Sequence, residues 1–131
     1  MTQIWKDDAA IPVSPLKLSD NSKLDSFKEG ELLKVSGITK GHGFQGVVKR
    51  YSFGGGPKTH GQKNRYRAPG SIGNTSPQRV VPGRKMAGHM GVRTKTIRNL
   101  EVVAIDKDQS LLMVRGSVPG NTKGKIVITK A

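Results

Sequence analysis

Residues 96–115 read TIRNLEVVAIDKDQSLLMVR, two aliphatic and β-branched runs with polar residues between them. The first run, residues 96–105, and the second, residues 111–115, each have the length and composition typical of a β-strand. The residues from Asp106 to Gln109 are charged or polar, as expected for a turn. The pattern therefore predicts a β-hairpin in the C-terminal part of the chain.

Further strands are expected around this hairpin. Residues 31–38 (ELLKVSGI) place Leu33 and Val35 on one face of a strand, and residues 125–129 (KIVIT) alternate in the same way. A short strand is also expected over residues 47–51 (VVKRY), because its β-branched start favours extended backbone. We find no repeat, heptad pattern or long amphipathic helix, so the sequence predicts a mainly β fold.

The N-terminal residues complete this picture. Residues 11–15 (IPVSP) are held extended by their prolines, and residues 22–28 favour a short helical turn. A length of 131 residues predicts a single domain. We expect a small antiparallel β-barrel formed by residues of approximately 1–15, 31–51 and 96–131, with a long irregular basic extension at approximately 52–95.

The middle of the chain is cationic and contains no carboxylate. Between Glu31 and Glu101 there is no Asp or Glu, whereas this stretch holds fourteen basic residues and thirteen of the 17 glycines. The formal net charge is +14, and the pI is about 10.5. Such charge repels itself, and a polyanion relieves the repulsion when its counterions are released. Residues 54–70 have Tyr66 as their one large apolar or aromatic side chain, so we expect this part to be mobile without a ligand.

Composition argues against several other classes of protein. An anionic membrane surface usually binds a basic amphipathic helix, which the Gly and Pro residues of the middle segment would break. No apolar run approaches the roughly 20 residues of a membrane span, and the first eight residues do not resemble a secretory signal. The chain has no cysteine, hence no disulfide or thiolate site. The three histidines lie far apart with no carboxylate nearby, so no metal site, and no cofactor, is expected.

The sequence contains few of the residue patterns that are typical of catalytic sites. No nucleophile elbow or paired carboxylate occurs in the middle segment, and we do not expect an enzyme. Residues 41–46 (GHGFQG) match the G-x-G-x-x-G pattern of dinucleotide-binding folds. That fold needs a helix opening at the third glycine and an acidic residue about 20 positions later. The expected strand at 47–51 and the absence of any acid before Glu101 favour a glycine-rich turn, with a nucleotide-dependent enzyme as the alternative.

Four aromatic residues interleave with the basic ones, namely Phe44, Tyr51, Phe53 and Tyr66. Tyr66 lies between Arg65 and Arg67, the arrangement expected for stacking on an unpaired base with phosphates bound on both sides. We expect Phe44 and Tyr51 at the edge of the barrel. Arginines can also bridge phosphates bidentately or stack on bases, which lysines cannot do. The segment therefore favours an RNA-binding arm, with a general nucleic-acid chaperone as a further alternative.

The predicted RNA-binding residues are cations of the middle segment, its three histidines and Tyr66. They are Lys40, His42, Lys49, Arg50, Lys58, His60, Lys63, Arg65, Tyr66, Arg67, Arg79, Arg84, Lys85, His89, Arg93 and Lys95.

Several motifs occur in order and together are similar to one family. They are residues 41–50 (GHGFQGVVKR), 55–61 (GGPKTHG), 67–73 (RAPGSIG), 83–91 (GRKMAGHMG), 99–103 (NLEVV), 111–114 (LLMV) and 116–120 (GSVPG). This combination closely resembles the bacterial form of the large-subunit ribosomal protein three family, the L-three family. The resemblance covers roughly residues 27–131, and residues 1–4 with Pro12 and Val13 resemble the first strand of the family.

The resemblance implies a β-barrel of the translation-protein type on the surface of the large ribosomal subunit. It implies an arm, here roughly residues 52–95, that runs through ribosomal RNA toward the peptidyl transferase centre and aids subunit assembly. The implied partners are large-subunit ribosomal RNA and neighbouring ribosomal proteins, with a cytoplasmic location on the ribosome and no membrane or small-molecule substrate. Met1 corresponds to an internal position of the family, and a long family segment between about Pro15 and Ser22 is absent, so the chain resembles a member shortened in its N-terminal half.

Overall fold

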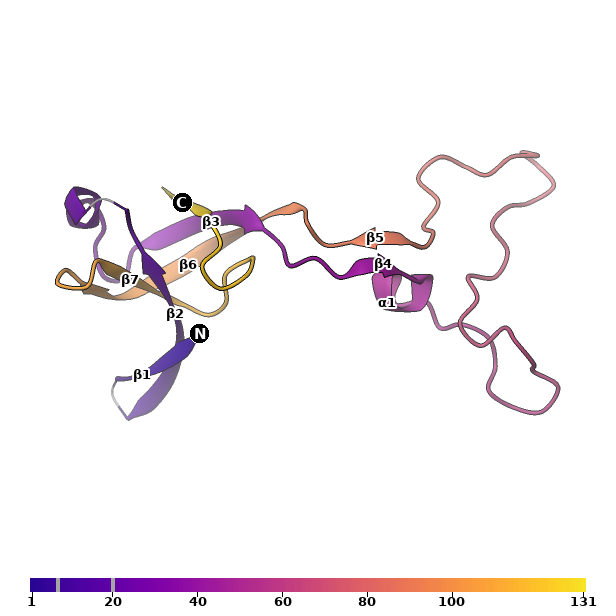
Figure 1. Cartoon of the computed structure of the whole chain (residues 1–131), viewed down its shortest axis with the longest axis horizontal. Helices are drawn as coiled ribbons and strands as arrows, with labels where there is room; N and C mark the ends of the chain where they lie inside the picture. Colours follow the sequence, from indigo (N-terminus) through magenta and orange to yellow (C-terminus); the bar gives the residue numbers. More distant parts are fainter. Residues whose placement is uncertain (7, 20) are drawn as a thin grey trace. The chain divides into compact units, whose positions relative to one another are not determined.

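The computed structural model describes residues 1–6, 8–19 and 21–131, which divide into two units. Unit 1 comprises Met1–Lys40 and Val92–Ala131, and unit 2 comprises Gly41–Gly91. Unit 1 holds β1 (Thr2–Lys6), β2 (Ala9–Lys17), the 3-10 helix η1 (Asn21–Ser26), β3 (Leu32–Ile38), β6 (Thr94–Asp106), β7 (Leu111–Arg115) and β8 (Ile126–Lys130). Unit 2 holds β4 (Gly43–Gln45), α1 (Val47–Tyr51) and β5 (Gly88–Met90). Figure 1 labels these elements, except η1 and β8.

The strands of unit 1 form one antiparallel sheet. In the described part of the chain it has six strands in the order β1-β2-β7-β6-β3-β8. The predicted C-terminal hairpin is confirmed as β6 and β7. Its turn is held by the Asp106 carboxylate, whose Oδ1 accepts hydrogen bonds from the backbone N–H groups of Asp108 (3.0 Å) and Gln109 (3.1 Å). The strands predicted at 31–38 and 125–129 are confirmed as β3 and β8. The mainly β class is therefore confirmed.

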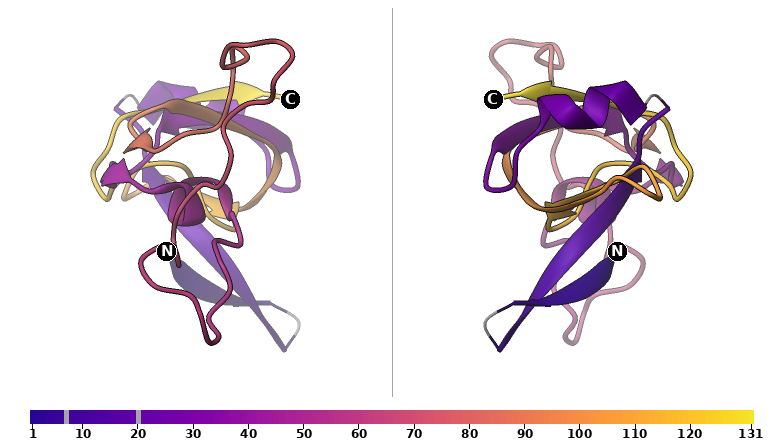
Figure 2. Two further views of the ribbon diagram at one scale, coloured as in Figure 1. Left: turned by 90° about the vertical axis from the view of Figure 1, so that its right-hand side faces the viewer. Right: turned by 90° about the vertical axis from the view of Figure 1, so that its left-hand side faces the viewer.

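The expected β-barrel is not closed among the residues that the structure describes. Among the described residues no pairing joins the edge strands β1 and β8, and the sheet curls around the core without closing (Figure 2). Helix η1 lies beside the end of β8, because Lys130 Nζ donates a hydrogen bond to the Ser26 carbonyl oxygen (2.6 Å). Leu24 of η1 is 2% exposed and belongs to the core. A helix thus covers core residues at the edge where a barrel would need another paired strand. The place between about Pro15 and Ser22 where a long family segment is absent includes Asp20, which lies outside the described residues.

Two irregularities bend β6, the strand at the centre of the sheet. Leu33 pairs with Leu100 and Val35 with Ile97, so β6 uses one more residue than β3 between these pairs. Asn99 lies in this bulge with φ +58°, a left-handed conformation that asparagine adopts more readily than most residues. A second shift occurs between Val102 and Ala104 against β7. Because bulges increase strand twist, β6 can pair with β3 along one half and β7 along the other.

The core of unit 1 is aliphatic. Its buried cluster consists of Leu16, Leu24, Leu33, Val35, Leu100, Val102, Leu112 and Val114. These side chains come from η1 and from β2, β3, β6 and β7, and alternation along each strand directs them to one face. Leu18, Phe27, Ile126 and Ile128 are half-buried and pack against this cluster. Unit 1 therefore has its own hydrophobic core, formed by segments from both ends of the chain.

Unit 2 departs from the sequence prediction at residues 47–51. This segment is the helix α1, not a strand. Gly46 is extended (φ −71°, ψ 165°), its carbonyl accepts from the Arg50 N–H (2.9 Å), and Ser52 ends the helix in a left-handed conformation (φ 60°). Val47 is 3% exposed, and the Ser52 backbone N–H donates to the Val47 carbonyl at the end of the helix. Burial of this valine and the terminal hydrogen bond outweigh the weak β preference of a five-residue segment.

A short hairpin begins and ends unit 2. Strand β4 pairs with β5 through Gly43 and Met90, Phe44 and His89, and Gln45 and Gly88. Residues 41–46 were expected to be a loop and residues 53–92 mostly irregular. The hairpin corrects both expectations at their ends, whereas the structure between α1 and β5 is irregular. Phe44 and Tyr51 were expected at the barrel edge, but both belong to unit 2, and Phe44 is 76% exposed.

Candidate nucleic-acid interface

Unit 2 carries positive charge with no internal neutralisation. Residues 41–91, all of which the structure describes, contain no Asp or Glu. They contain nine basic residues, which are Lys49, Arg50, Lys58, Lys63, Arg65, Arg67, Arg79, Arg84 and Lys85. Each of the ion pairs found among the described residues lies in unit 1. The positive charge of unit 2 is therefore not neutralised by ion pairs within that unit.

The structure leaves the predicted site residues accessible. Thirteen of the sixteen lie in unit 2, and Lys40, Arg93 and Lys95 lie in unit 1. All sixteen are exposed except Arg50, which is half-buried. Among the described residues, the guanidinium groups of Arg50 and Arg84 donate to backbone carbonyls, of Met86 (2.6 Å) and Ser71 respectively. A neutral carbonyl acceptor leaves the charge of each arginine intact, so both remain able to attract phosphate.

The helix α1 holds a cationic and aromatic cluster. The Arg50 guanidinium lies over the Tyr51 ring at 5.0 Å from its centroid, and Lys85 Nζ lies at 5.6 Å from the same centroid. The rings of Tyr51 and Phe53 are 6.3 Å apart. Cation–π attraction of this kind positions charged groups without neutralising them. The cluster therefore brings Lys85, near the end of the irregular segment, next to Tyr51, near its start. The Tyr51 ring holds Arg50 and Lys85 in place, although the sequence prediction put Tyr51 at the barrel edge.

Backbone contacts organise the segment around Arg65, Tyr66 and Arg67. The Gly56 N–H donates to the Tyr66 carbonyl (3.1 Å). A Cβ built on Gly55, whose φ is +73°, would collide with the Tyr66 carbonyl oxygen. Glycine is needed here because only hydrogen lets the two backbones meet. Tyr66 is 43% exposed, and Arg65 and Arg67 on either side of it are exposed as well.

The hairpin of unit 2 presents another group of predicted residues. His89 pairs in register with Phe44 across β4 and β5, and the His42 N–H donates to the Met90 carbonyl (2.9 Å). In the described part of the chain, no three His, Asp or Glu side chains gather as a metal site. Phe44 is an exposed aromatic residue opposite His89 that was not among the predicted site residues. Its position between two glycine-rich turns was the available signal.

One feature of the structure agrees with the alternative of a dinucleotide-binding fold, and the other features of that fold are not found around residues 41–51. The helix α1 does begin directly after Gly46, against expectation. However, β4 lies inside the G-x-G-x-x-G motif and pairs antiparallel with β5, whereas the dinucleotide fold has a parallel strand before the first glycine. The helix has five residues, and the first acidic residue after it is Glu101. The arrangement thus offers no ribose-binding carboxylate near the motif.

Unit 1 pairs its charges internally. Lys107 lies 2.7 Å from Asp25, Lys130 lies 2.8 Å from Glu31, and an Arg115–Glu101 pair spans 3.2 Å. The hydrogen bond from Lys130, followed by one from the Lys28 backbone, lowers the pKa of Glu31. The hydrogen bond to Asp25 raises the pKa of Lys107. Unit 1 therefore neutralises part of its own charge, in contrast to unit 2.

These features define a basic, mainly β protein whose net positive charge is concentrated in one glycine-rich unit. No helix among the described residues is long and apolar enough to cross a membrane. The family model for Ribosomal protein L3 matches residues 17–111. The chain therefore belongs to the ribosomal protein L3 family.

Individual relatives agree with this assignment. The chain is 50% identical over 119 residues to large ribosomal subunit protein uL3 of Dehalococcoides mccartyi, an alignment that covers 90% of this chain and 58% of the relative. It is 56% identical over 110 residues to uL3 of Chlorobium phaeovibrioides, covering 82% of this chain and 53% of the relative. It is 50% identical over 107 residues to uL3 of Thioalkalivibrio sulfidiphilus, covering 81% and 50%. The chain thus spans between half and three-fifths of the length of these relatives.

Proposed function

We propose that this chain is a structural, non-catalytic constituent of the large ribosomal subunit that binds large-subunit ribosomal RNA through unit 2. The observation that carries the proposal is the set of nine basic residues over 41–91 with no carboxylate among them. Membership of the ribosomal protein L3 family supports the choice of ribosomal RNA as the polyanion. The partners are this RNA and neighbouring ribosomal proteins, and the location is the ribosome in the cytoplasm.

The two units have different roles in this proposal. Unit 1, with its own aliphatic core and internal ion pairs, is the stable body that packs on RNA helices. Unit 2 is the extension whose cations neutralise phosphates and whose exposed Tyr66 stacks on a base. The predicted RNA-binding residues, from Lys40 to Lys95, belong to this proposal. We further propose, from the resemblance of its motifs to the family, that the extension reaches toward the peptidyl transferase centre and aids subunit assembly.

Salt dependence of RNA affinity tests the proposal. Each phosphate contact lowers the slope of log affinity against log salt by roughly 0.7–0.9. If six to nine of the unit 2 cations contact phosphates, the slope is about −4 to −8, and affinity falls by about 10²- to 10⁵-fold between roughly 50 and 200 mM salt. The measurement is a fluorescence-anisotropy titration of the full chain with labelled large-subunit ribosomal RNA. A slope shallower than about −2 would contradict the proposal.

Competition separates this function from a general nucleic-acid chaperone. A chaperone that binds through charge alone has little preference between structured ribosomal RNA and a random duplex. A structural constituent has contacts placed by the fold, such as the Gly56–Tyr66 backbone bond that orders the segment next to Arg65 and Arg67. We expect large-subunit RNA to compete at least about tenfold better than a random duplex of equal length. Equal competition would favour the chaperone.

A further inference from the structure

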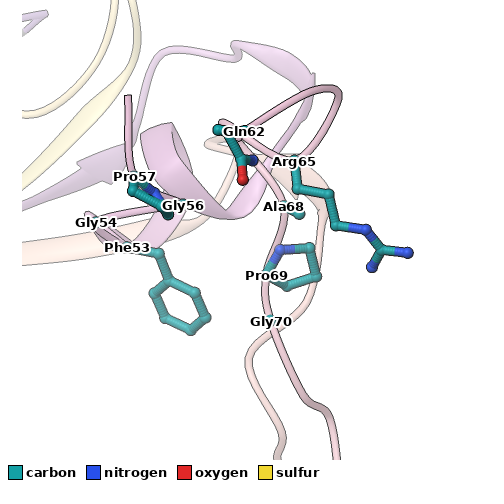
Figure 3. A pocket seen from close by; sticks show the side chains of 10 residues that line it. Phe53, Gly54, Gly56, Pro57, Gln62, Arg65, Ala68, Pro69 and Gly70 are labelled. Atoms are coloured by element: carbon teal, nitrogen blue, oxygen red, sulfur yellow. The ribbon is translucent and has the colours of Figure 1, made fainter. Parts of the chain in front are cut away.

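A hollow in unit 2 has the shape and composition of a ligand site. Its volume is about 530 Å³, within the range of about 300–1,000 Å³ typical of small-ligand pockets. Figure 3 shows the Phe53 ring and the Pro69 ring on either side of it, with the Gln62 amide at its rim. The Arg65 guanidinium points away from it. The remaining lining is short, from Gly54, Gly55, Gly56, Pro57, Ala68 and Gly70.

The walls of the hollow are fixed by contacts within the chain. The Gly56–Tyr66 backbone bond joins its two sides. A Cβ on Gly56 would lie 2.7 Å from the Arg65 carbonyl oxygen, so only glycine permits this approach. In the amide orientation that satisfies its neighbours, Gln62 accepts from the N–H groups of Arg65 (3.1 Å) and Tyr66 (3.2 Å). These contacts hold the two sides of the hollow next to each other.

The chemistry of the lining fits one kind of ligand. A nucleobase is planar, with apolar faces and hydrogen-bonding edges. Phe53, half-buried, offers an aromatic face for stacking, and the proline opposite offers an apolar one. The Gln62 side chain at the rim carries an amide NH₂ group, a donor of the kind that a base edge accepts. The surrounding cations attract the phosphates to which that base is attached, and no carboxylate opposes them.

We propose that this hollow receives one unpaired base of the bound RNA, stacked on Phe53 and hydrogen-bonded by Gln62. The inference rests on the proposed function, because the base arrives on the RNA strand that unit 2 binds. It adds a specific base contact to phosphate contacts that carry no sequence information by themselves. It also assigns Phe53 a role distinct from that of Tyr66, which is exposed outside the lining of the hollow.

Four variants of the full chain test this assignment. Phe53→Leu removes the aromatic face and keeps apolar bulk, whereas Phe53→Tyr keeps the face. Ala68→Leu fills the hollow without touching Phe53. Trp5→Leu is the matched control, because Trp5 is an exposed aromatic residue (69%) in unit 1. Each variant is bound to large-subunit ribosomal RNA, and base reactivity is probed with dimethyl sulfate and carbodiimide, in parallel with hydroxyl-radical cleavage of the backbone.

The inference predicts a loss confined to the base. At least one unpaired base protected by the original chain becomes reactive with Phe53→Leu and Ala68→Leu, and stays protected with Phe53→Tyr and Trp5→Leu. The affinity of the Phe53→Leu chain falls by about 5- to 150-fold, the cost of one base–aromatic stack, while the backbone footprint and salt slope are unchanged. Unchanged base reactivity in both loss variants overturns the base assignment alone. A flat salt dependence of the original chain overturns the proposed function and this inference together.

Discussion

Replacing Arg65 and Arg67 together by glutamine removes two charges from the centre of the proposed interface. Both side chains are exposed, and the local hydrogen bond from Gly56 goes to the backbone carbonyl of Tyr66, so the fold of this segment does not depend on either guanidinium. If each arginine contacts one phosphate, the slope of log affinity against log salt becomes shallower by about 1.4–1.8. At about 0.1 M salt, counterion release alone then predicts a loss of about 25- to 60-fold in affinity.

The matched control has the same change of charge in unit 1. Lys107→Gln combined with Lys130→Gln removes two ammonium groups that already lie against Asp25 (2.7 Å) and Glu31 (2.8 Å). Their charge is locally balanced, so we expect the salt slope to change by less than about 0.5. The assay is fluorescence anisotropy with large-subunit ribosomal RNA at several salt concentrations, after circular dichroism has confirmed that both variants fold. Equal changes of slope in the two double variants would refute the reasoning, because net charge alone would then govern binding.

Three further predictions concern stability and loop geometry. Leu33→Ala, at a side chain with 0% exposure, should lower the free energy of unfolding by about 2–5 kcal/mol in urea denaturation, and a loss below about 1 kcal/mol would show that the core is not packed as described. Gly55→Ala should speed amide hydrogen exchange in the glycine-rich loop, because φ of Gly55 is +73° and the added Cβ would collide with a carbonyl. Gly54→Ala is the control, because Gly54 has open space around it and no positive φ. Equal exchange in both variants would contradict the loop geometry. The Lys130 hydrogen bond lowers the pKa of Glu31 from the ordinary value of 4.5. Glu31 therefore contributes stability that is fully present above pH 4.5 and is lost as the pH falls through the lower pKa of the folded state. Glu31→Gln should reduce the loss of stability at acid pH in thermal unfolding, and an unchanged pH profile would rule out this pair as the source of that loss.

The strands of unit 1 were predictable because apolar residues that are buried alternate along them with residues that are more exposed. Leu33 and Val35 both have 0% exposure and lie on the same face of β3, as the sequence pattern indicated. The hairpin of β6 and β7 was predictable from two apolar runs around an aspartate turn. The open sheet was not, because whether edge strands meet depends on bulges such as that at Asn99 and on the packing of η1, which leave no periodic signal.

Unit 2 was predictable in its charge and less so in its conformation. Ionisation of arginine and lysine does not depend on the fold, so the excess of cations could be counted from the chain. The helix α1 was missed because Val47 and Val48 favour strands, while the contacts that fix the helix come from its ends and from Arg50 bonding to Met86. The hollow next to Phe53 was also missed. It depends on backbone contacts between glycines and residues about ten positions away, which side-chain patterns do not encode.

We propose above that the cations of unit 2, which have no carboxylate among residues 41–91, bind a defined surface of ribosomal RNA. A hydroxyl-radical footprint of the purified full chain on large-subunit ribosomal RNA, taken with excess random duplex present, tests it most directly. We expect protection of a defined set of backbone positions. This protection should disappear when Arg65 and Arg67 are both replaced by glutamine and persist when Lys107 and Lys130 are. Protection that is absent, or spread evenly and removed by the competitor duplex, would contradict it.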